Sequence, residues 1–214
     1  PTFDNIKRWE KRVNDRCPFC GNVQTLLHNL SNCNVSLDQG RYTWRHNSVL
    51  KSIIETIHPL LDPAFRLYSD MPGYEAPHGG TIPPHILVTS LRPDLFLVNE
   101  AARKAIVFEL TCPWDSNVDR SHNFKQEKYA PLVADLSRSF TVHQFSFEVS
   151  VRGQISKRNK ERMKAFIHRC CVSPGKLAKR AVENSSKASL LSSYSIFCAR
   201  KEPAWNSPAP LTVQ

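Results

Sequence analysis

Two short apolar runs separated by a polar turn limit the folds open to this chain more than any other feature. The runs are residues 94–98 (DLFLV) and residues 105–110 (AIVFEL), with residues 99–104 between them. Short runs that are nearly continuous in apolar residues are typical of strands covered on both faces. We therefore expect a buried antiparallel hairpin, although each run carries one acid, Asp94 or Glu109, where water is scarce.

A regular helical pattern precedes the hairpin. Its apolar side chains recur at the spacing of one helix face, and they are Val49, Leu50, Ile53, Ile54 and Ile57. Asn47 or Ser48 would be its N-cap. Pro59 or Pro63 would end it, because proline rarely continues a helix. A shorter helix is expected at residues 3–13, where apolar residues also recur at near-helical spacing.

The remaining patterns complete a layered domain. Residues 69–90 are rich in proline and glycine, which favours a loop. Residues 121–137 have helical spacing, whereas residues 141–151 alternate between apolar and polar positions as a strand does. Basic helices are expected at residues 157–171 and 176–191. This order of elements predicts an α/β domain in which a mixed sheet is flanked by helices.

A cluster of cysteines and one histidine lies near the start of the chain. The chain has 7 cysteines, and the spacing C-x2-C-x7-H-x4-C joins Cys17, Cys20, His28 and Cys33. Zinc prefers four thiolate or imidazole ligands, and a site with four protein ligands is structural because it leaves no open position for water. The spacing therefore indicates structural zinc in a reducing compartment rather than a disulfide framework.

The net positive charge of the chain comes from its last third. Residues 1–150 contain 16 lysines and arginines and 16 acids, whereas residues 151–214 contain 13 and 3, which accounts for the whole formal charge of +10. A solvated surface usually intersperses both signs, so this segregation favours a nucleic-acid partner over a membrane. The candidate nucleic-acid contacts are Arg152, Lys157, Arg158, Lys160, Arg162 and Lys164.

Length and composition set the domain organisation. With 214 residues, the chain can form one main core with appendages, since domains most often contain about 100 to 150 residues. Residues 1–40 would form a helix and a zinc knuckle, and residues 41–155 the main core. Residues 156–202 would form a basic helical extension, and residues 203–214 a disordered tail.

The start of the chain and its hydropathy indicate a soluble fragment of a longer polypeptide. The first residue is Pro1 rather than methionine. No apolar run approaches the roughly 18 residues that a membrane-spanning helix needs, and no signal-like leader is present. We therefore expect no membrane partner.

The acids of the hairpin could form a metal site. If the two strands are antiparallel, the carboxylates of Asp94 and Glu109 can point to one place. Such oxygen ligands suit Mg²⁺ or Mn²⁺, and an ion of this kind can activate a water and neutralise charge on a phosphodiester. Spacing alone leaves an alternative open, in which Asp94 begins a strand after Pro93 and Glu109 is a paired structural acid.

The residues around these acids resemble the PD-(D/E)xK nuclease superfamily. The matching residues are RPD at 92–94, ELT at 109–111, and then Lys125, Lys128 and Tyr129. Thr111 stands where the superfamily usually has a strand lysine, two residues after Glu109 and on the same face. The lysine would then have moved to the following helix, where residues three and four positions apart share one side.

Longer segments resemble the carboxyl-terminal region of the non-LTR retrotransposons that carry a restriction-like endonuclease. The segments are HGGTIPPHILVTSLRPDLFLV, VFELTCPWD, KQEKYAPL and FEVSVRGQISKRN. In that family a C-C-H-C knuckle lies between the reverse transcriptase and the nuclease. The resemblance covers about residues 17–159. One departure is CPWD, where related sequences read more like V-P-F-E, so Asp115 is either an extra acid near the metal or a turn residue.

The resemblance implies a fold, an activity and partners. Residues 41–155 would form a restriction-endonuclease-like core that cuts one strand of a target DNA in the nucleus. The new 3′ hydroxyl would prime reverse transcription of the element RNA by an upstream reverse transcriptase domain of the same polypeptide, since no reverse-transcriptase motif is present in this chain. The cofactors would be catalytic Mg²⁺ or Mn²⁺ and structural Zn²⁺.

The resemblance also assigns roles to residues. Asp94 and Glu109 would hold the catalytic metal. Lys125 would steady the attacked phosphate or orient the water, with Lys128 and Tyr129 beside it, and one of the two lysines would instead belong to a solvated helix face.

Some alternatives stay open. His46 is either a third ligand of the catalytic metal, a phosphate contact, or a residue with a capping or hydrogen-bonding role. A nuclease fold that has lost activity, and only binds nucleic acid or the partner polymerase, is the first rival. A structural scaffold in a larger ribonucleoprotein is the second. No recognition helix can be singled out, so the sequence predicts no target site.

Overall fold

The computed structural model describes residues 16–77 and 79–213. Within them, four strands form one sheet in the order β1-β2-β3-β4, and they are β1 (Arg66–Ser69), β2 (Leu95–Asn99), β3 (Lys104–Thr111) and β4 (Thr141–Glu148). The first three pair antiparallel, whereas β3 and β4 pair parallel. The predicted hairpin is therefore present as β2 and β3. The helix expected at residues 3–13 lies outside the described residues.

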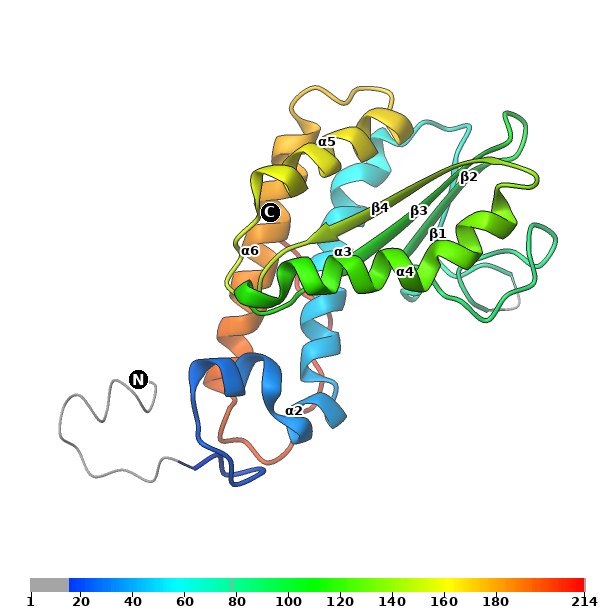
Figure 1. Cartoon of the computed structure of the whole chain (residues 1–214). Coiled ribbons are helices and arrows are strands. Elements are labelled where there is room, and N and C mark those ends of the chain that lie inside the picture. Colours follow the sequence, from blue (N-terminus) through cyan, green and yellow to red (C-terminus); the bar gives the residue numbers. More distant parts are fainter. Residues whose placement is uncertain (1–15, 78, 214) are drawn as a thin grey trace.

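Helices cover both faces of the sheet (Figure 1). The long helices are α3 (Arg41–Ile57), α4 (Val118–Leu136), α5 (Lys157–Cys170) and α6 (Leu177–Cys198). Helix α4 connects β3 to β4 and lies on one face, while the other three pack on the opposite side. The predicted α/β class, with a mixed sheet flanked by helices, is confirmed. Each helix among the described residues is too short or too polar to cross a membrane.

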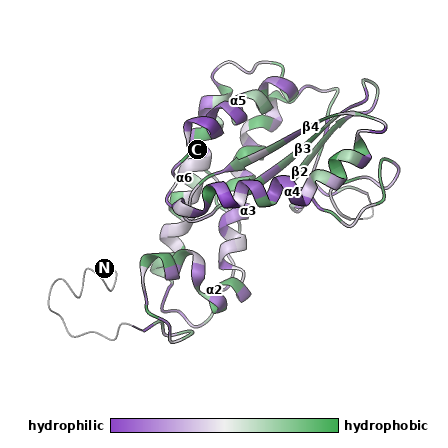
Figure 2. Ribbon diagram, viewed as in Figure 1, coloured by the Kyte–Doolittle hydropathy of each residue, from purple (hydrophilic) through white to green (hydrophobic). Residues whose placement is uncertain are grey.

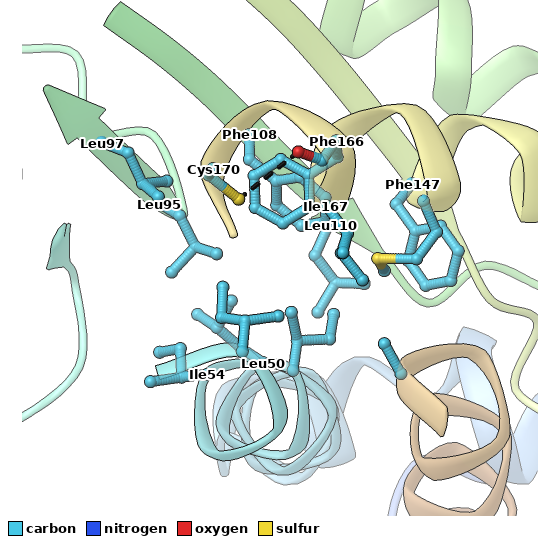
Figure 3. Packing of buried hydrophobic residues seen from close by; sticks show 14 of the residues in the cluster. Leu50, Ile54, Leu95, Leu97, Phe108, Leu110, Phe147, Phe166, Ile167 and Cys170 are labelled. Atoms are coloured by element: carbon cyan, nitrogen blue, oxygen red, sulfur yellow. Dashed lines mark hydrogen bonds between the residues drawn. The ribbon is translucent and has the colours of Figure 1, made fainter. Parts of the chain in front are cut away.

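The larger hydrophobic core lies between the sheet and α3, α5 and α6. The sheet contributes Leu95, Leu97, Ile106, Phe108, Leu110 and Phe147. In Figure 3 the side chains of Leu95, Leu97 and Leu110 lie across from those of Leu50 and Ile54, which are one turn apart on α3. Phe108 also packs on Phe166 of α5, with ring centroids 4.5 Å apart. Helix α5 is therefore held firmly in this core.

A second core lies between the sheet and α4. Its fully buried members are Ile82, Phe96, Val98, Ala105, Val107, Tyr129, Leu132 and Leu136. Alternate residues of a strand point to the same face, so Glu109, two residues after Val107, also points toward α4. Glu109 has an exposed fraction of 0%. The two cores explain why the strands are apolar on both faces and place one acid beneath α4.

The cysteine-rich region packs at the first turns of α3. The short helices η1 (His28–Asn32) and α2 (Asn34–Asp38) follow the first two cysteines. Helix η1 shares a hydrophobic cluster with α3 and α6, and the buried members of this cluster are Leu30, Trp44, Val151 and Ile196. Figure 2 shows both green and purple stretches in this region.

Residues 203–213, for which we expect disorder, contain no helix or strand but lie along α3. The indole Nε1 of Trp44 donates to the carbonyl of Ala209 at 3.2 Å. The buried Arg41 donates to the carbonyl of Ala199 at 2.7 Å. Its guanidinium lies 4.9 Å from the ring centroid of Phe19 and 5.0 Å from that of Trp205. The first turn of α3 thus connects the cysteine-rich region to the end of the chain.

Two local predictions differ from the structure. Helix α3 begins at Arg41, after a glycine with a left-handed φ of 73°, so Asn47 and Ser48 lie inside the helix and the predicted N-cap is wrong. The first turns of α3 are polar, so the spacing of apolar residues does not reveal where the helix begins. The helix ends at Ile57, just before Pro59, as predicted. The short polar strand β1 was not predicted.

Candidate active site and metal cluster

The two acids of the hairpin meet at one edge of the sheet. Asp94 precedes β2 and Glu109 lies near the end of β3. The backbone N–H of Asp94 donates to Oε1 of Glu109 at 3.2 Å. The N–H of Leu110 donates to Oδ2 of Asp94 at 2.7 Å. The antiparallel hairpin therefore brings both carboxylates together, as the sequence suggested.

Lys125 of α4 completes this group. Its Nζ lies 2.6 Å from Oε2 of Glu109 and 3.7 Å from Oδ2 of Asp94. One turn later, the hydroxyl of Tyr129 donates to the carbonyl of Arg92 at 2.7 Å, which fastens α4 to the segment before Asp94.

Lys128 is placed differently. It is exposed, and its Nζ lies 5.0 Å from the ring centroid of Tyr129. Of the two candidate lysines, Lys125 is the one that contacts the acids.

His46 reaches the same place from the opposite side of the sheet. It lies in the second turn of α3, not at the start of the helix. Its Nε2 is 3.4 Å from Oδ2 of Asp94 and 3.3 Å from the carbonyl of Leu110. The acids, Lys125 and His46 therefore come from four different parts of the chain.

The charged groups at this site shift one another's pKa. Burial raises the pKa of Glu109 to about 8, and the Asp94 carboxylate adds to the shift. Burial acts to raise the pKa of Asp94 too, but His46 and Lys125 outweigh it and lower that pKa to about 2. Burial acts to lower the pKa of Lys125, yet the two carboxylates hold it above its ordinary value. The Lys125 ammonium thus faces two acids whose pKa values are shifted in opposite directions.

Two of these side chains are of the chemical type that binds divalent cations. The ammonium group of Lys125 lies within 3.7 Å of both carboxylates, so the acid pair can share one positive charge. Carboxylate oxygens are also the donors that Mg²⁺ and Mn²⁺ prefer. Asp94 and Glu109 are therefore the residues that could hold such an ion, with His46 beside Asp94.

Replacing Glu109 by glutamine is expected to flatten the pH dependence of stability. The folded-state pKa of Glu109, about 8, lies above its ordinary value of 4.5. Its contribution to the free energy of unfolding is therefore fully present below about pH 4.5 and is lost as the pH rises through about 8. The raised pKa of His46 acts in the same direction above 6.5. The lowered pKa of Asp94 acts only below 3.8.

The measurement is urea unfolding of the zinc-loaded protein, without added Mg²⁺ or Mn²⁺, across this pH window. Subtracting the Glu109→Gln curve from the wild-type curve isolates the contribution of Glu109. The difference should fall as the pH rises. Parallel curves for the two proteins would contradict the raised pKa.

Thr111 and Asp115 lie just beyond the acids. The hydroxyl oxygen of Thr111 is buried without a hydrogen-bond partner among the described residues. Asp115 begins the short helix η3 (Asp115–Asn117), and its Oδ2 accepts from Nε of Arg152 at 2.6 Å. Asp115 therefore pairs with a cation at a helix start.

The predicted zinc ligands form a compact cluster. The ligand atoms of Cys17, Cys20, His28 and Cys33 all lie within 4.8 Å of one another. Sγ of Cys20 is 3.3 Å from Nε2 of His28, and Sγ of Cys33 is 3.9 Å from that of Cys17. This Cys₃His cluster can hold a metal such as zinc.

Side chains of helix α3 hydrogen-bond to the backbone of the cluster. The hydroxyl of Tyr42 accepts from the N–H of Cys33 at 3.1 Å and lies 3.2 Å from the carbonyl of His28. Arg45, which is buried, donates to the carbonyl of Leu30 at 2.9 Å. The backbone around the metal ligands is thus bonded to the same helix that carries His46.

The candidate nucleic-acid contacts divide into two groups. Four of them are exposed on α5, and they are Lys157, Arg158, Lys160 and Lys164. Arg152 is half-exposed beside Asp115. Arg162 instead points inward and donates to Oε2 of Glu148 at 3.1 Å. The four exposed side chains on α5 are therefore the ones positioned to contact a polyanion.

Sequence reasoning missed a second polar group at the same face of the sheet. Glu148 at the end of β4 is 1% exposed and contacts His122 of α4 as well as Arg162. Gln126 of α4 donates to the hydroxyl of Ser146 at 2.8 Å. The signal was present in the spacing of residues 122, 126 and 129, which share one side of a helix. Their partners on β4 could not be identified without the sheet pairing.

No protein-family model matches this chain, and a search of curated proteins finds no match.

Proposed function

We propose that this chain is a divalent-metal-dependent DNA endonuclease domain of the PD-(D/E)xK type. The observation that carries the proposal is the meeting of Asp94, Glu109 and Lys125, which come from a hairpin and the helix that follows it. A buried acid with a raised pKa beside an ionised acid and a lysine is typical of a site that performs chemistry. Both carboxylates are of the type that holds Mg²⁺ or Mn²⁺.

Each residue has a role in phosphodiester hydrolysis. A bound Mg²⁺ or Mn²⁺ would supply the charge that activates a water and neutralises the attacked phosphate. Asp94 and Glu109 would hold that ion. Lys125 steadies the attacked phosphate or orients the water as a cation, which requires no proton transfer from it. Tyr129 keeps α4 in place against the segment before Asp94, and His46 holds the Asp94 carboxylate from the other side.

The exposed basic residues of α5 supply the grip on DNA. Lysines and arginines that contact phosphates release counterions, so binding falls steeply with salt concentration. Such contacts hold the backbone without reading the base sequence. The Cys₃His cluster is a structural zinc knuckle in this proposal, and zinc knuckles also contact nucleic acids.

The order of the motifs supports a proposal for the process in which this domain acts. A cysteine-histidine knuckle followed by a nuclease core and a basic extension supports a role in non-LTR retrotransposition. The domain then nicks a nuclear target DNA, and an upstream reverse transcriptase domain of the same polypeptide copies the element RNA from the new 3′ hydroxyl.

Nicking of supercoiled plasmid with Mg²⁺ or Mn²⁺ tests the proposal. The wild-type chain is expected to convert the plasmid to the open-circular form, and Asp94→Ala to lose this activity. Asp135→Ala is the matched control, because Asp135 is a half-exposed acid of α4 paired with Arg138. Wild-type protein that binds DNA without cutting it, or an Asp94→Ala variant that cuts equally well, would leave only the binding or scaffold role.

A further inference from the structure

The first half of α4 has no hydrophobic anchor of its own. The buried side chains of α4 are Tyr129, Leu132 and Leu136, all in its second half. In residues 118–128, the large apolar side chain Phe124 is 62% exposed. Lys125 lies in this polar half, which is mostly purple in Figure 2. Its position relative to the acids therefore depends on polar contacts.

Those polar contacts connect α4 to β4. His122, one turn before Lys125, has its Nδ1 3.0 Å from Oε1 of Glu148. Gln126 donates to Ser146, as described above. Ser146 and Glu148 pair in register with Glu109 and Thr111 of β3, respectively, so His122 and Lys125 contact neighbouring positions of one polar row on the sheet.

Glu148 is in turn held by α5. Arg162 donates through Nη1 to Oε2 of Glu148 at 3.1 Å and to Oδ1 of Asn159 at 2.9 Å. Asn159 donates to the backbone carbonyl of Glu148 at 3.0 Å. Helix α5 is fixed because Phe166 packs in the larger core. Through this network, α5 therefore also holds the polar first half of α4 in place.

His122 contacts both Glu148 and Arg162. Its Nδ1 lies 3.0 Å from Oε1 of Glu148 and 3.2 Å from Nη1 of Arg162, and its Nε2 lies 3.0 Å from Nη2 of Arg162. The carboxylate can only accept a hydrogen bond and the guanidinium can only donate one. The imidazole therefore lies between an acceptor and a donor, to which glutamine can bond through its amide and phenylalanine cannot.

We propose that Arg162, Glu148 and His122 are positioning residues. They fix where the first half of α4 lies on the sheet, so that Lys125 contacts Asp94 and Glu109. The proposal rests on the nuclease function proposed above. It removes Arg162 from the DNA-binding set and gives it an internal role. Loss of a residue that orients the groups of a metal site through hydrogen bonds typically changes activity by about 10- to 100-fold.

A pair of variants at His122 tests the positioning role in the full chain. His122→Phe is expected to lower kcat for plasmid nicking by about 10-fold or more and to leave KM for DNA unchanged, because the exposed basic face is intact. His122→Gln keeps a donor and an acceptor and should restore most of kcat. Equal activity of His122→Phe and wild type, or equal losses in the two variants, would overturn the proposal.

Hydrogen exchange gives a readout that does not require nuclease activity. Glu148→Gln removes the charge that holds Arg162, and Glu183→Gln makes the same change at an exposed acid of α6 that pairs with Lys179. Amide exchange in residues 118–128 should be faster in Glu148→Gln and His122→Phe but not in Glu183→Gln. If the wild type does not cut DNA, faster exchange still supports the positioning network, and unchanged exchange rejects it.

Discussion

Replacing Lys125 by methionine is expected to lower kcat for nicking by about 10²- to 10³-fold, the range for loss of one charge-stabilising donor. Methionine keeps much of the apolar stem but removes the ammonium group that lies 2.6 Å from Glu109 and 3.7 Å from Asp94. KM for DNA should change little, because the exposed lysines and arginines of α5 remain. Steady-state nicking at several DNA concentrations separates the two parameters.

Two other lysines provide the comparison. Lys104→Met changes an exposed lysine at the far end of β3 and is expected to leave kcat unchanged. Lys128→Met removes the exposed lysine beside the Tyr129 ring and should lower kcat far less than Lys125→Met. If Lys128→Met caused the larger loss, the assignment of the catalytic lysine would be reversed.

The Lys125→Met variant also has an effect without DNA. Its two acids lose the cation that they share, so a divalent ion no longer competes with an ammonium group for them. Addition of Mn²⁺ should therefore raise the melting temperature of the variant more than that of the wild type, since a ligand that binds only the folded state stabilises it. Equal shifts in the two proteins would argue against metal binding by Asp94 and Glu109.

Replacing Cys33 by serine is expected to abolish zinc binding and to lower the free energy of unfolding by more than about 4 kcal/mol, as the loss of a metal site can. Cys33 is 2% exposed, and its Sγ lies 3.9 Å from Sγ of Cys17 and 4.0 Å from Sγ of Cys20. Small metal-bound units draw much of their folding energy from the metal. Metal analysis and denaturant unfolding measure both effects.

The control for the zinc prediction is Cys198→Ser, which changes an exposed cysteine outside the cluster. It should keep its zinc and its stability. In Cys33→Ser, amide exchange should become faster in residues 17–46, because Tyr42 and Arg45 lose ordered partners in the cluster. A Cys33→Ser protein that retains zinc at the wild-type ratio would show that the cluster is not a four-ligand site.

Local pattern was sufficient for the elements that carry the acids. The runs at residues 94–98 and 105–110 are apolar on both faces because two cores enclose the sheet. An antiparallel hairpin necessarily returns the chain to its starting edge, so the meeting of Asp94 and Glu109 followed from pattern and spacing. The Cys₃His cluster was equally predictable, because its residues have the sequence spacing that is typical of a metal knuckle.

Pattern was insufficient where helix rotation or long-range pairing decides the outcome. Lys125 lies four residues before the buried Tyr129, and Lys128 lies four residues before the buried Leu132, so spacing places both on the inner side of α4. Only the packing of the helix on the sheet distinguishes them. Arg162 looked like a surface cation because its partner, Glu148, is on another element.

The buried Arg41 has a consequence for how the chain is made. Its partner Ala199 lies 158 residues later in the sequence, and Trp44 bonds to Ala209 at a separation of 165 residues. Contacts between distant residues form slowly, and synthesis proceeds from the amino terminus at roughly 5 to 20 residues per second. The cysteine-rich region therefore leaves the ribosome well before the residues that cover Arg41. During that interval Arg41 and Trp44 lack these partners, so the first turn of α3, against which the cysteine-rich region packs, is completed only late in synthesis.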